Sequence, residues 1–362
     1  MARIDAILKQ VKDLGASDLH MTTGSPPMVR IQGDITPIPY EPLTREMSEM
    51  LLFEIMDAPT RAKFDAQKDV DFSYEVAGVV RVRCNIYEQY KGPAGAFRVL
   101  PSQILTLDQL GVPPNLARLT ESPRGLIVVT GPPGSGKSST MAALIDHLNR
   151  TQKKHILTIE DPIEYRHQNQ QCLITQREVG RNTPSFAKAL HGALREDPDV
   201  ILVGEMRDTE TMALAMTAAA TGQLVLGTLH TMSATQTVDR ILDSFEGERQ
   251  AQARLMLSES LKGVLAQRLL RRSDGKGREL ALEVMVATPA VSALIREKKT
   301  FQLQSVIQTG KKEGMQSMDD ALMQLVREGR VTPHDAAPHL SSKELLPALE
   351  RMAPPGNPSQ AA

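Results

Sequence analysis

The chain has 362 residues with 42 basic and 43 acidic side chains, so its formal net charge is −1. This balance excludes a global electrostatic field that would draw the protein to nucleic acid or to an anionic membrane surface. At roughly 150 residues per domain, the length predicts two domains, each long enough to bury its own core. The cysteines, Cys84 and Cys172, lie far apart and match no metal-binding spacing, which is typical of a reducing compartment.

The first hundred residues alternate between short helical and strand patterns. The helical pattern over 2–14 carries charges among its apolar residues, so it lacks the apolar core of a signal peptide, and we expect a cytoplasmic protein. Two further helical patterns follow at 44–57 and 59–66. Strand patterns occupy 18–21, 28–31, 71–76, 79–87 and 94–99. Residues 1–100 are therefore predicted to form a small α/β domain.

Four prolines lie within 101–123, which predicts an interdomain linker. From 124 to 352, strand patterns alternate with helical ones. The strands at 125–130, 155–160, 199–204 and 224–229 are apolar runs, without the alternation of a half-exposed sheet. This pattern predicts a parallel sheet that is buried on both faces. Right-handed crossovers then bring the loops after these strands to one edge of the sheet.

Four other segments of the second half have distinct patterns. Residues 211–230 carry no Lys, Arg, Asp or Glu and are long enough to cross a bilayer, but Thr221-Gly-Gln223 interrupts them, so we predict a helix followed by a strand. Residues 248–272 show a long helical pattern, and 280–286 are predicted as a strand. The composition of 353–362, Ala-Pro-Pro-Gly-Asn-Pro-Ser-Gln-Ala-Ala, predicts a disordered tail.

The most informative motif is Gly131-Pro-Pro-Gly-Ser-Gly-Lys-Ser138, which meets the P-loop pattern between a predicted strand and a predicted helix. In such a loop, backbone N–H groups and the helix N-terminus bind phosphates, the lysine adds a charge, and the serine hydroxyl ligates Mg²⁺. We therefore expect ATP and Mg²⁺ as ligands. The predicted nucleotide-binding residues are Gly131, Pro132, Pro133, Gly134, Ser135, Gly136, Lys137, Ser138 and Ser139.

Carboxylates follow two of the neighbouring strands. Glu205 ends the strand pattern Asp199-Val-Ile-Leu-Val-Gly204, where it is placed to orient or deprotonate a water molecule. The position just before Glu205, where an aspartate commonly ligates Mg²⁺, is Gly204 here. The metal contacts are therefore expected from the Ser138 hydroxyl, from water and from other residues that carry carboxylates. Glu160 and Glu164 supply these acids after the strand at 155–160, and we expect Glu160 to assist Ser138 as a Mg²⁺ ligand.

His230 ends the strand pattern Leu224-Val-Leu-Gly-Thr-Leu229 at the same predicted edge. A histidine by itself is more often structural than functional. Its position beside the phosphate loops nevertheless favours a role in sensing the γ-phosphate or in linking it to a neighbouring subunit.

Four segments together resemble the secretion ATPase superfamily, and specifically the type IV pilus retraction ATPases: the P-loop, the acidic box at 159–164, the segment 197–208 with its Gly-Glu-Met-Arg-Asp sequence, and Gly227-Thr-Leu-His-Thr231. The resemblance extends from Ala16 to about Gly329. It implies a PAS-like N-terminal domain and a RecA-like ATPase domain with a central parallel sheet.

The resemblance also implies a function and partners. The expected protein is a homohexameric motor that couples ATP hydrolysis to pilus retraction, and so to twitching motility, through domain rotation. Its ATP sites lie between protomers, and Arg83 and Arg98 of the small domain contact the phosphates, with Arg81 a weaker candidate. Expected partners are the inner-membrane platform protein of the pilus machine, through which the cytoplasmic motor is held at the membrane, and a paralogous pilus ATPase.

Two segments depart from the family pattern. Gln223 stands where a histidine is common, and Val291-Ser-Ala293 replaces the commoner Ile-Arg-Asn of a retraction motif. We expect basal ATPase activity to survive the second departure, whereas its effect on coupling to retraction is open. The segments Gln168-Asn169 and 174–179 are also compatible with the accessory branch of retraction ATPases.

Two rival functions remain open. A RecA-like nucleic-acid motor would use the same ATP core, but the aromatic content of 3% without Trp leaves few stacking platforms, so no nucleic-acid partner is expected. A structural ring that binds ATP without hydrolysing it is the other rival. The presence of Glu205 favours turnover.

Overall fold

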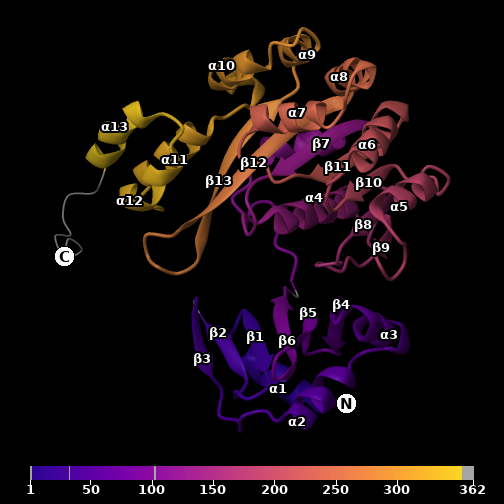
Figure 1. Ribbon diagram of the computed structural model, residues 1–362. Helices are drawn as coiled ribbons and strands as arrows, with labels where there is room; N and C mark the ends of the chain where they lie inside the picture. The colour runs from indigo at the N-terminus through magenta and orange to yellow at the C-terminus, as the bar shows by residue number, and fades with distance from the viewer. Residues whose placement is uncertain (1, 32, 102, 353–362) are drawn as a thin grey trace. The chain divides into compact units, whose positions relative to one another are not determined.

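The computed structural model describes residues 2–31, 33–101 and 103–352. The chain divides into two compact units, Met1–Gln103 and Ile104–Ala362 (Figure 1). Each unit has its own sheet and its own hydrophobic core. The segment predicted as a disordered tail, 353–362, lies outside the described residues.

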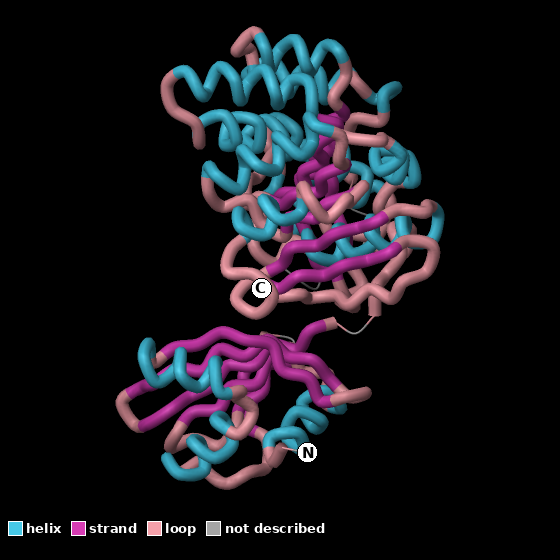
Figure 2. The backbone as a smooth tube through the Cα atoms, turned by 90° about the vertical axis from the view of Figure 1, so that its right-hand side faces the viewer, coloured by secondary structure: helices cyan, strands magenta, loops and turns pink. Residues whose placement is uncertain are grey.

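The N-terminal unit is built on an antiparallel sheet, drawn in magenta in Figure 2. The order of its strands is β3-β2-β1-β6-β5-β4. On β5, Val82, Cys84 and Ile86 are buried while the residues between them are more exposed, which is the alternation that the sequence predicts. This architecture agrees with the expected PAS-like domain. Its elements are α1 (Ile4–Asp13), β1 (Asp18–Thr22), β2 (Met28–Ile31), β3 (Asp34–Pro37), α2 (Arg45–Phe53), α3 (Ala58–Gln67), β4 (Asp69–Val76), β5 (Val80–Gln89) and β6 (Gly92–Leu100).

The second unit contains a sheet with the order β13-β12-β7-β11-β10-β8-β9, in which all neighbouring strands are parallel except β12 and β13. The strands are β7 (Gly125–Thr130), β8 (His155–Glu160), β9 (Leu173–Glu178), β10 (Val200–Val203), β11 (Leu224–Thr228), β12 (Leu261–Arg271) and β13 (Arg278–Val286). The helices are α4 (Lys137–Thr151), α5 (Phe186–Ala193), α6 (Thr209–Thr221), α7 (Ala234–Asp243), α8 (Glu248–Ser260), α9 (Pro289–Arg296), α10 (Leu303–Thr309), α11 (Met318–Arg327), α12 (Pro333–Ala336) and α13 (Leu346–Arg351).

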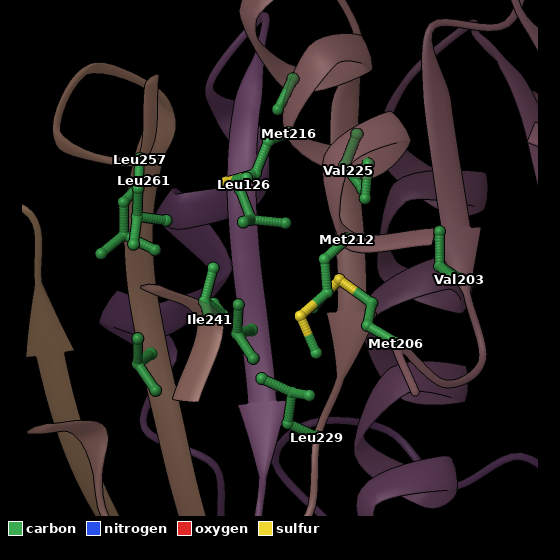
Figure 3. Close-up of a cluster of buried hydrophobic side chains, with 14 of the residues drawn as sticks. Leu126, Val203, Met206, Met212, Met216, Val225, Leu229, Ile241, Leu257 and Leu261 are labelled. Atoms are coloured by element: carbon green, nitrogen blue, oxygen red, sulfur yellow. The ribbon is translucent and has the colours of Figure 1, made fainter. Parts of the chain in front are cut away.

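Apolar side chains cover both faces of this sheet. On one face, Met212 and Met216 of α6 pack with Leu126 and Val225 of the central strands (Figure 3). On the other face, α4 packs against the neighbouring residues of the same strands. The central strands are buried along their whole length, as the unbroken apolar runs predict.

The segment predicted as a linker belongs largely to the second unit. Residues from Ile104 onward pack within that unit, where Leu107, Val112 and Leu116 are buried on the α4 side of the sheet. The prolines predicted a segment without long helices or strands, and among its described residues the one regular element is a 3-10 helix at Pro114–Glu121. The apolar residues between the prolines nevertheless bury against the sheet, so the prediction of a linker over 101–123 is corrected.

The long helix predicted over 248–272 is wrong in its second half. The helix α8 ends at Ser260, and the chain continues at once as β12, Leu261–Arg271. The apolar residues of this segment fit a helical spacing, but they are buried on both faces because β12 lies between β7 and β13. Hydrophobic periodicity does not distinguish a buried strand from a buried helix, so the pairing with β7 decides.

The uncharged stretch before His230 forms α6 followed by β11, as predicted, with Gly222 between them. Within 2–31, 33–101 and 103–352, no helix has both the length and the apolar character needed to cross a membrane. Gln223 stands at the amino end of β11, and His230 lies beyond its carboxyl end. The departure at position 223 is therefore separated from His230 by the length of the strand, about 17 Å at roughly 3.3 Å per residue.

Candidate active site

The predicted site residues of the second unit lie at one edge of its sheet. The P-loop follows β7, His230 follows β11, Glu205 follows β10, and Glu160 ends β8. These strands are consecutive neighbours in the order β7-β11-β10-β8 and run parallel, so their carboxyl ends share an edge. The convergence that the sequence predicts is thus present for Lys137, His230, Glu205 and Glu160.

The backbone of the P-loop forms an anion-binding geometry. Gly131, Gly134 and Gly136 have φ values of 142°, 75° and 89°, which favour glycine. The helix α4 begins at Lys137, and among the described residues no side chain caps its N-terminus. The N–H groups of its first turn have no acceptor within the helix, and the helix dipole favours a negative charge there. This end of α4 therefore fits a phosphate group.

Lys137 is held within the loop by polar contacts. Its Nζ donates to the carbonyl oxygens of Gly131 at 2.8 Å and Pro132 at 3.1 Å, and it lies 3.3 Å from Nδ1 of His230. Burial lowers the pKa of Lys137, while the charges of Glu205 and Glu164 partly oppose this effect. The charge of Glu164 thus acts on the ammonium group, and the role of Glu164 in the site remains a prediction.

A chain of polar contacts connects the P-loop lysine to the predicted catalytic carboxylate. His230 Nε2 lies 3.0 Å from Glu205 Oε1, and Arg207 lies 2.7 Å from Glu205 Oε2. An ammonium group has no acceptor, so Nδ1 of His230 accepts from Lys137 and the ring proton on Nε2 is donated to Glu205. Burial acts to raise the pKa of Glu205, but the hydrogen bond and charge of Arg207, together with His230, outweigh it and lower the pKa.

Glu160 has a different environment. Burial of its carboxyl group raises the pKa of Glu160 to about 7, and hydrogen bonds from Thr158 at 2.7 Å and Gln176 at 3.1 Å only partly oppose this. A carboxyl group poised near neutrality fits a site whose charge changes when a cationic ligand arrives. The role of Glu160 as a Mg²⁺ ligand remains a prediction.

The donor set fits a magnesium ion bound together with a nucleotide. Ser138 lies in the first turn of α4, beside the phosphate-binding backbone. Within the described part of the chain, no group of three or more His, Cys, Asp or Glu residues forms a cage for a metal ion. Mg²⁺ commonly keeps several waters and binds through one or two protein groups and the substrate phosphates, which is what this edge offers.

Several supporting residues were not identified from the sequence. Gln267 on β12 is buried and donates from Nε2 to the carbonyl oxygen of Ser135 at 2.7 Å. This hydrogen bond fixes the P-loop to β12. Thr130 contacts Thr231 at 2.8 Å and thereby ties the end of β7 to the loop that carries His230. Arg207 lies in the Gly-Glu-Met-Arg-Asp segment, two residues after Glu205. This spacing was the one sequence feature that could have identified it as a partner of Glu205.

The remaining predicted residues, Arg83 and Arg98, lie in the N-terminal unit. They are direct partners across β5 and β6, so their side chains project from the same face of the sheet. Arg98 pairs with Asp18 at 2.9 Å and Arg83 with Asp71 at 3.5 Å. Arg98 is 73% exposed and Arg83 is 45% exposed. Two exposed guanidinium groups thus stand side by side, each next to a carboxylate.

The packing of the P-loop leads to a prediction about two of its glycines. A Cβ atom at 131 would overlap the carbonyl oxygen of Gln267 and lie 2.7 Å from Ser135 Oγ, whereas a Cβ at 134 meets nothing within 4 Å. We expect Gly131→Ala to lower the free energy of unfolding by about 2–5 kcal/mol through strain and overlap. Gly134→Ala serves as the control and costs about 1 kcal/mol for its backbone conformation alone. Urea unfolding measures both, and equal losses would contradict the packing argument.

Comparisons with known proteins agree with this geometry. The family described as type II/IV secretion system protein matches residues 1–338. The chain is 51% identical over 322 residues to the type IV pilus retraction ATPase PilT of Pseudomonas aeruginosa, with 89% of this chain and 93% of that protein covered. It is 49% identical over 320 residues to a twitching motility protein of Neisseria gonorrhoeae, with 88% and 86% covered.

A solved structure is similar over nearly the same length. The crystal structure of the pilus retraction motor PilT with bound ADP matches with a TM-score of 0.89 and 44% sequence identity, covering 96% of this chain and 99% of that chain. With its P-loop, acidic box and histidine at one sheet edge, the chain belongs to the type II/IV secretion system protein family and, within it, to the type IV pilus retraction ATPases.

Proposed function

We propose that this protein is an ATP-driven motor for type IV pilus retraction and hence for twitching motility. The observation that carries the proposal is the contact chain from Lys137 through His230 to Glu205, because it joins a phosphate-binding loop to a carboxylate that can act on water. The names of the similar proteins, a retraction ATPase and a twitching motility protein, give the proposal its biological direction.

In the proposed reaction, Lys137 and the N-terminus of α4 bind the β- and γ-phosphates, and Ser138 holds Mg²⁺, which supplies charge neutralisation when it is bound. Each oxygen of Glu205 has two acceptor positions, so this carboxylate can accept from a water while His230 and Arg207 hold it. The water oxygen attacks the γ-phosphorus, the bond to the bridging oxygen of ADP breaks, and a water proton passes through Glu205 to the released phosphate.

We extend the proposal to a homohexameric ring in which Arg83 and Arg98 of one protomer reach the nucleotide of its neighbour. Their exposure supports this role, and so does their position as direct partners on one face of the sheet. Withdrawal of such arginines by domain rotation would stop hydrolysis, which links chemistry to movement. In this proposal the motor works in the cytoplasm, at the inner membrane, on the platform protein and beside a paralogous pilus ATPase.

The first prediction from the proposed function separates a motor from a ring that only binds ATP. We expect Lys137→Ala and Glu205→Gln each to lower the rate of phosphate release by about a hundredfold or more, because they remove a phosphate contact and the water-activating group. Cells that carry either variant are expected to display pili but to lose twitching. Equal phosphate release by both variants and the unaltered protein would sink the enzymatic proposal.

The second prediction concerns the arginines of the small domain. We expect Arg98→Ala to keep the assembled ring and to lower the turnover rate by about a thousandfold or more, as for an arginine finger. Arg30→Ala, on β2 of the same sheet, is the control and should leave the turnover rate unchanged. Light scattering reports the assembly and phosphate release the turnover. A variant that dissociates into monomers, or full activity of the unaltered protein as a monomer, would assign Arg98 a different role.

The third prediction follows from the lowered pKa of Glu205. In Arg207→Gln the hydrogen bond and charge that lower this pKa are lost, so the pKa rises and more Glu205 is protonated at a given acidic pH. The acid limb of the profile of kcat/KM against pH should therefore move to higher pH. Arg150→Gln, whose guanidinium pairs with Asp146 near the far end of α4, is the control. An acid limb at the same pH in both variants would show that Glu205 does not control turnover.

A further inference from the structure

Two buried carboxylates lie on β13 and serve different partners. Glu279 is 4% exposed and pairs with Arg272 at 2.8 Å and with Arg330. Glu283, four residues further along, is 2% exposed and accepts instead from the backbone N–H of Ala234 at 2.6 Å. Burial raises the pKa of Glu283, and the backbones of Ala234 and Met318 act to lower it. A buried carboxylate that binds backbone N–H groups fixes the position of those backbone segments.

Both backbone partners of Glu283 are first residues of helices. Ala234 begins α7 and Met318 begins α11. The N–H group at this position has no acceptor within its own helix. The side-chain caps, Ser233 and Ser317, accept from N–H groups of later residues, so Glu283 supplies an acceptor that the caps do not. The positive ends of two helix dipoles therefore meet at one carboxylate.

The helix α7 in turn holds the loop that carries His230. Thr231 contacts Thr237 of α7 at 2.6 Å, and the N–H of Met232 donates to Gln236 at 3.1 Å. Thr231 also contacts Thr130 at the end of β7. His230 thus lies between contacts to the P-loop strand on one side and to α7 on the other, and Glu283 binds the N–H of Ala234, where α7 begins.

Charged groups on two neighbouring elements act on Glu283. The charge of Arg268 on β12 favours its carboxylate, and the charge of Asp319 on α11 disfavours it. Asp319 accepts from the N–H groups of Ser341 at 2.7 Å and Ser342 at 3.2 Å, and Arg268 lies 3.4 Å from Nδ1 of His339. The charges that act on Glu283 thus belong to side chains that contact residues 339–342.

We propose that Glu283 is a positioning residue for ATP hydrolysis: by holding the first residues of α7 and α11 together, it keeps His230 within reach of Lys137 and Glu205. Glu283 does not touch the predicted phosphate site and acts through α7. This inference rests on one part of the proposed function, namely that His230 takes part in ATP turnover. A group placed this way controls the rate of the chemical step more than the affinity for nucleotide.

The test compares Glu283→Gln with Glu279→Gln, a matched control on the same strand. An amide offers one oxygen and adds two donors, so the substituted side chain would lose one of the two backbone contacts. We expect kcat to fall roughly ten- to a hundredfold, as for a misplaced active-site group, while the Kd of a fluorescent ADP analogue changes by less than about threefold. Glu279→Gln is expected to lower the melting temperature and to leave kcat near that of the unaltered protein.

A double-mutant cycle with His230→Ala distinguishes positioning from general destabilisation. If Glu283 acts through His230, Glu283→Gln adds little further loss of kcat once His230 is absent, whereas independent effects multiply. The inference would be overturned if the losses of kcat in the two single variants multiplied fully in the double variant. An unchanged kcat for Glu283→Gln in an active protein would also overturn it. Should the glutamine variant not fold, Glu283→Asp, which keeps the charge on a shorter side chain, enters the same cycle. An unaltered protein without ATPase activity would instead refute the proposed function.

Discussion

The active-site edge depends on the close approach of the P-loop to the backbone of β12. This approach requires the absence of a side chain at Gly131, because a Cβ there would overlap the carbonyl oxygen of Gln267. With the loop seated on β12, the amide of Gln267 binds the carbonyl of Ser135, and α4 begins at Lys137 with its N–H groups directed along the helix axis toward the same edge. The position of the predicted phosphate site is thus set by backbone packing, and the charge of Lys137 adds to it.

Charge at this edge is distributed unevenly among the carboxylates. Glu205 shares its oxygens between His230 and Arg207, which keeps it ionised, whereas burial moves the pKa of Glu160 to about 7. Two carboxylates on neighbouring strands therefore have different proton affinities because their surroundings differ: ion pairs around Glu205 and burial around Glu160. The strand order, which places β10 beside β8, brings these environments together.

Much of the fold and of the site was predictable from the sequence. The P-loop, Glu205 and His230 could be placed because each follows an unbroken apolar strand, and parallel strands share their carboxyl edge. The strand at 261–271 was missed because burial on both faces removes the alternation that marks a strand. Gln267, Thr130 and Glu283 were missed because they act through contacts between residues far apart in the chain, and a buried polar residue has no sequence pattern of its own.

The hydrogen bonds of Lys137 would change when a phosphate binds beside it. The ammonium group directs its donors to two carbonyl oxygens of the loop and to the imidazole of His230. A phosphate that draws this ammonium to itself leaves Nδ1 of His230 without its donor, and the imidazole, still bound to Glu205, must find a new partner. In the proposed function, this exchange of hydrogen bonds across a single ring would transmit the binding of substrate to Glu205, the carboxylate proposed to activate water.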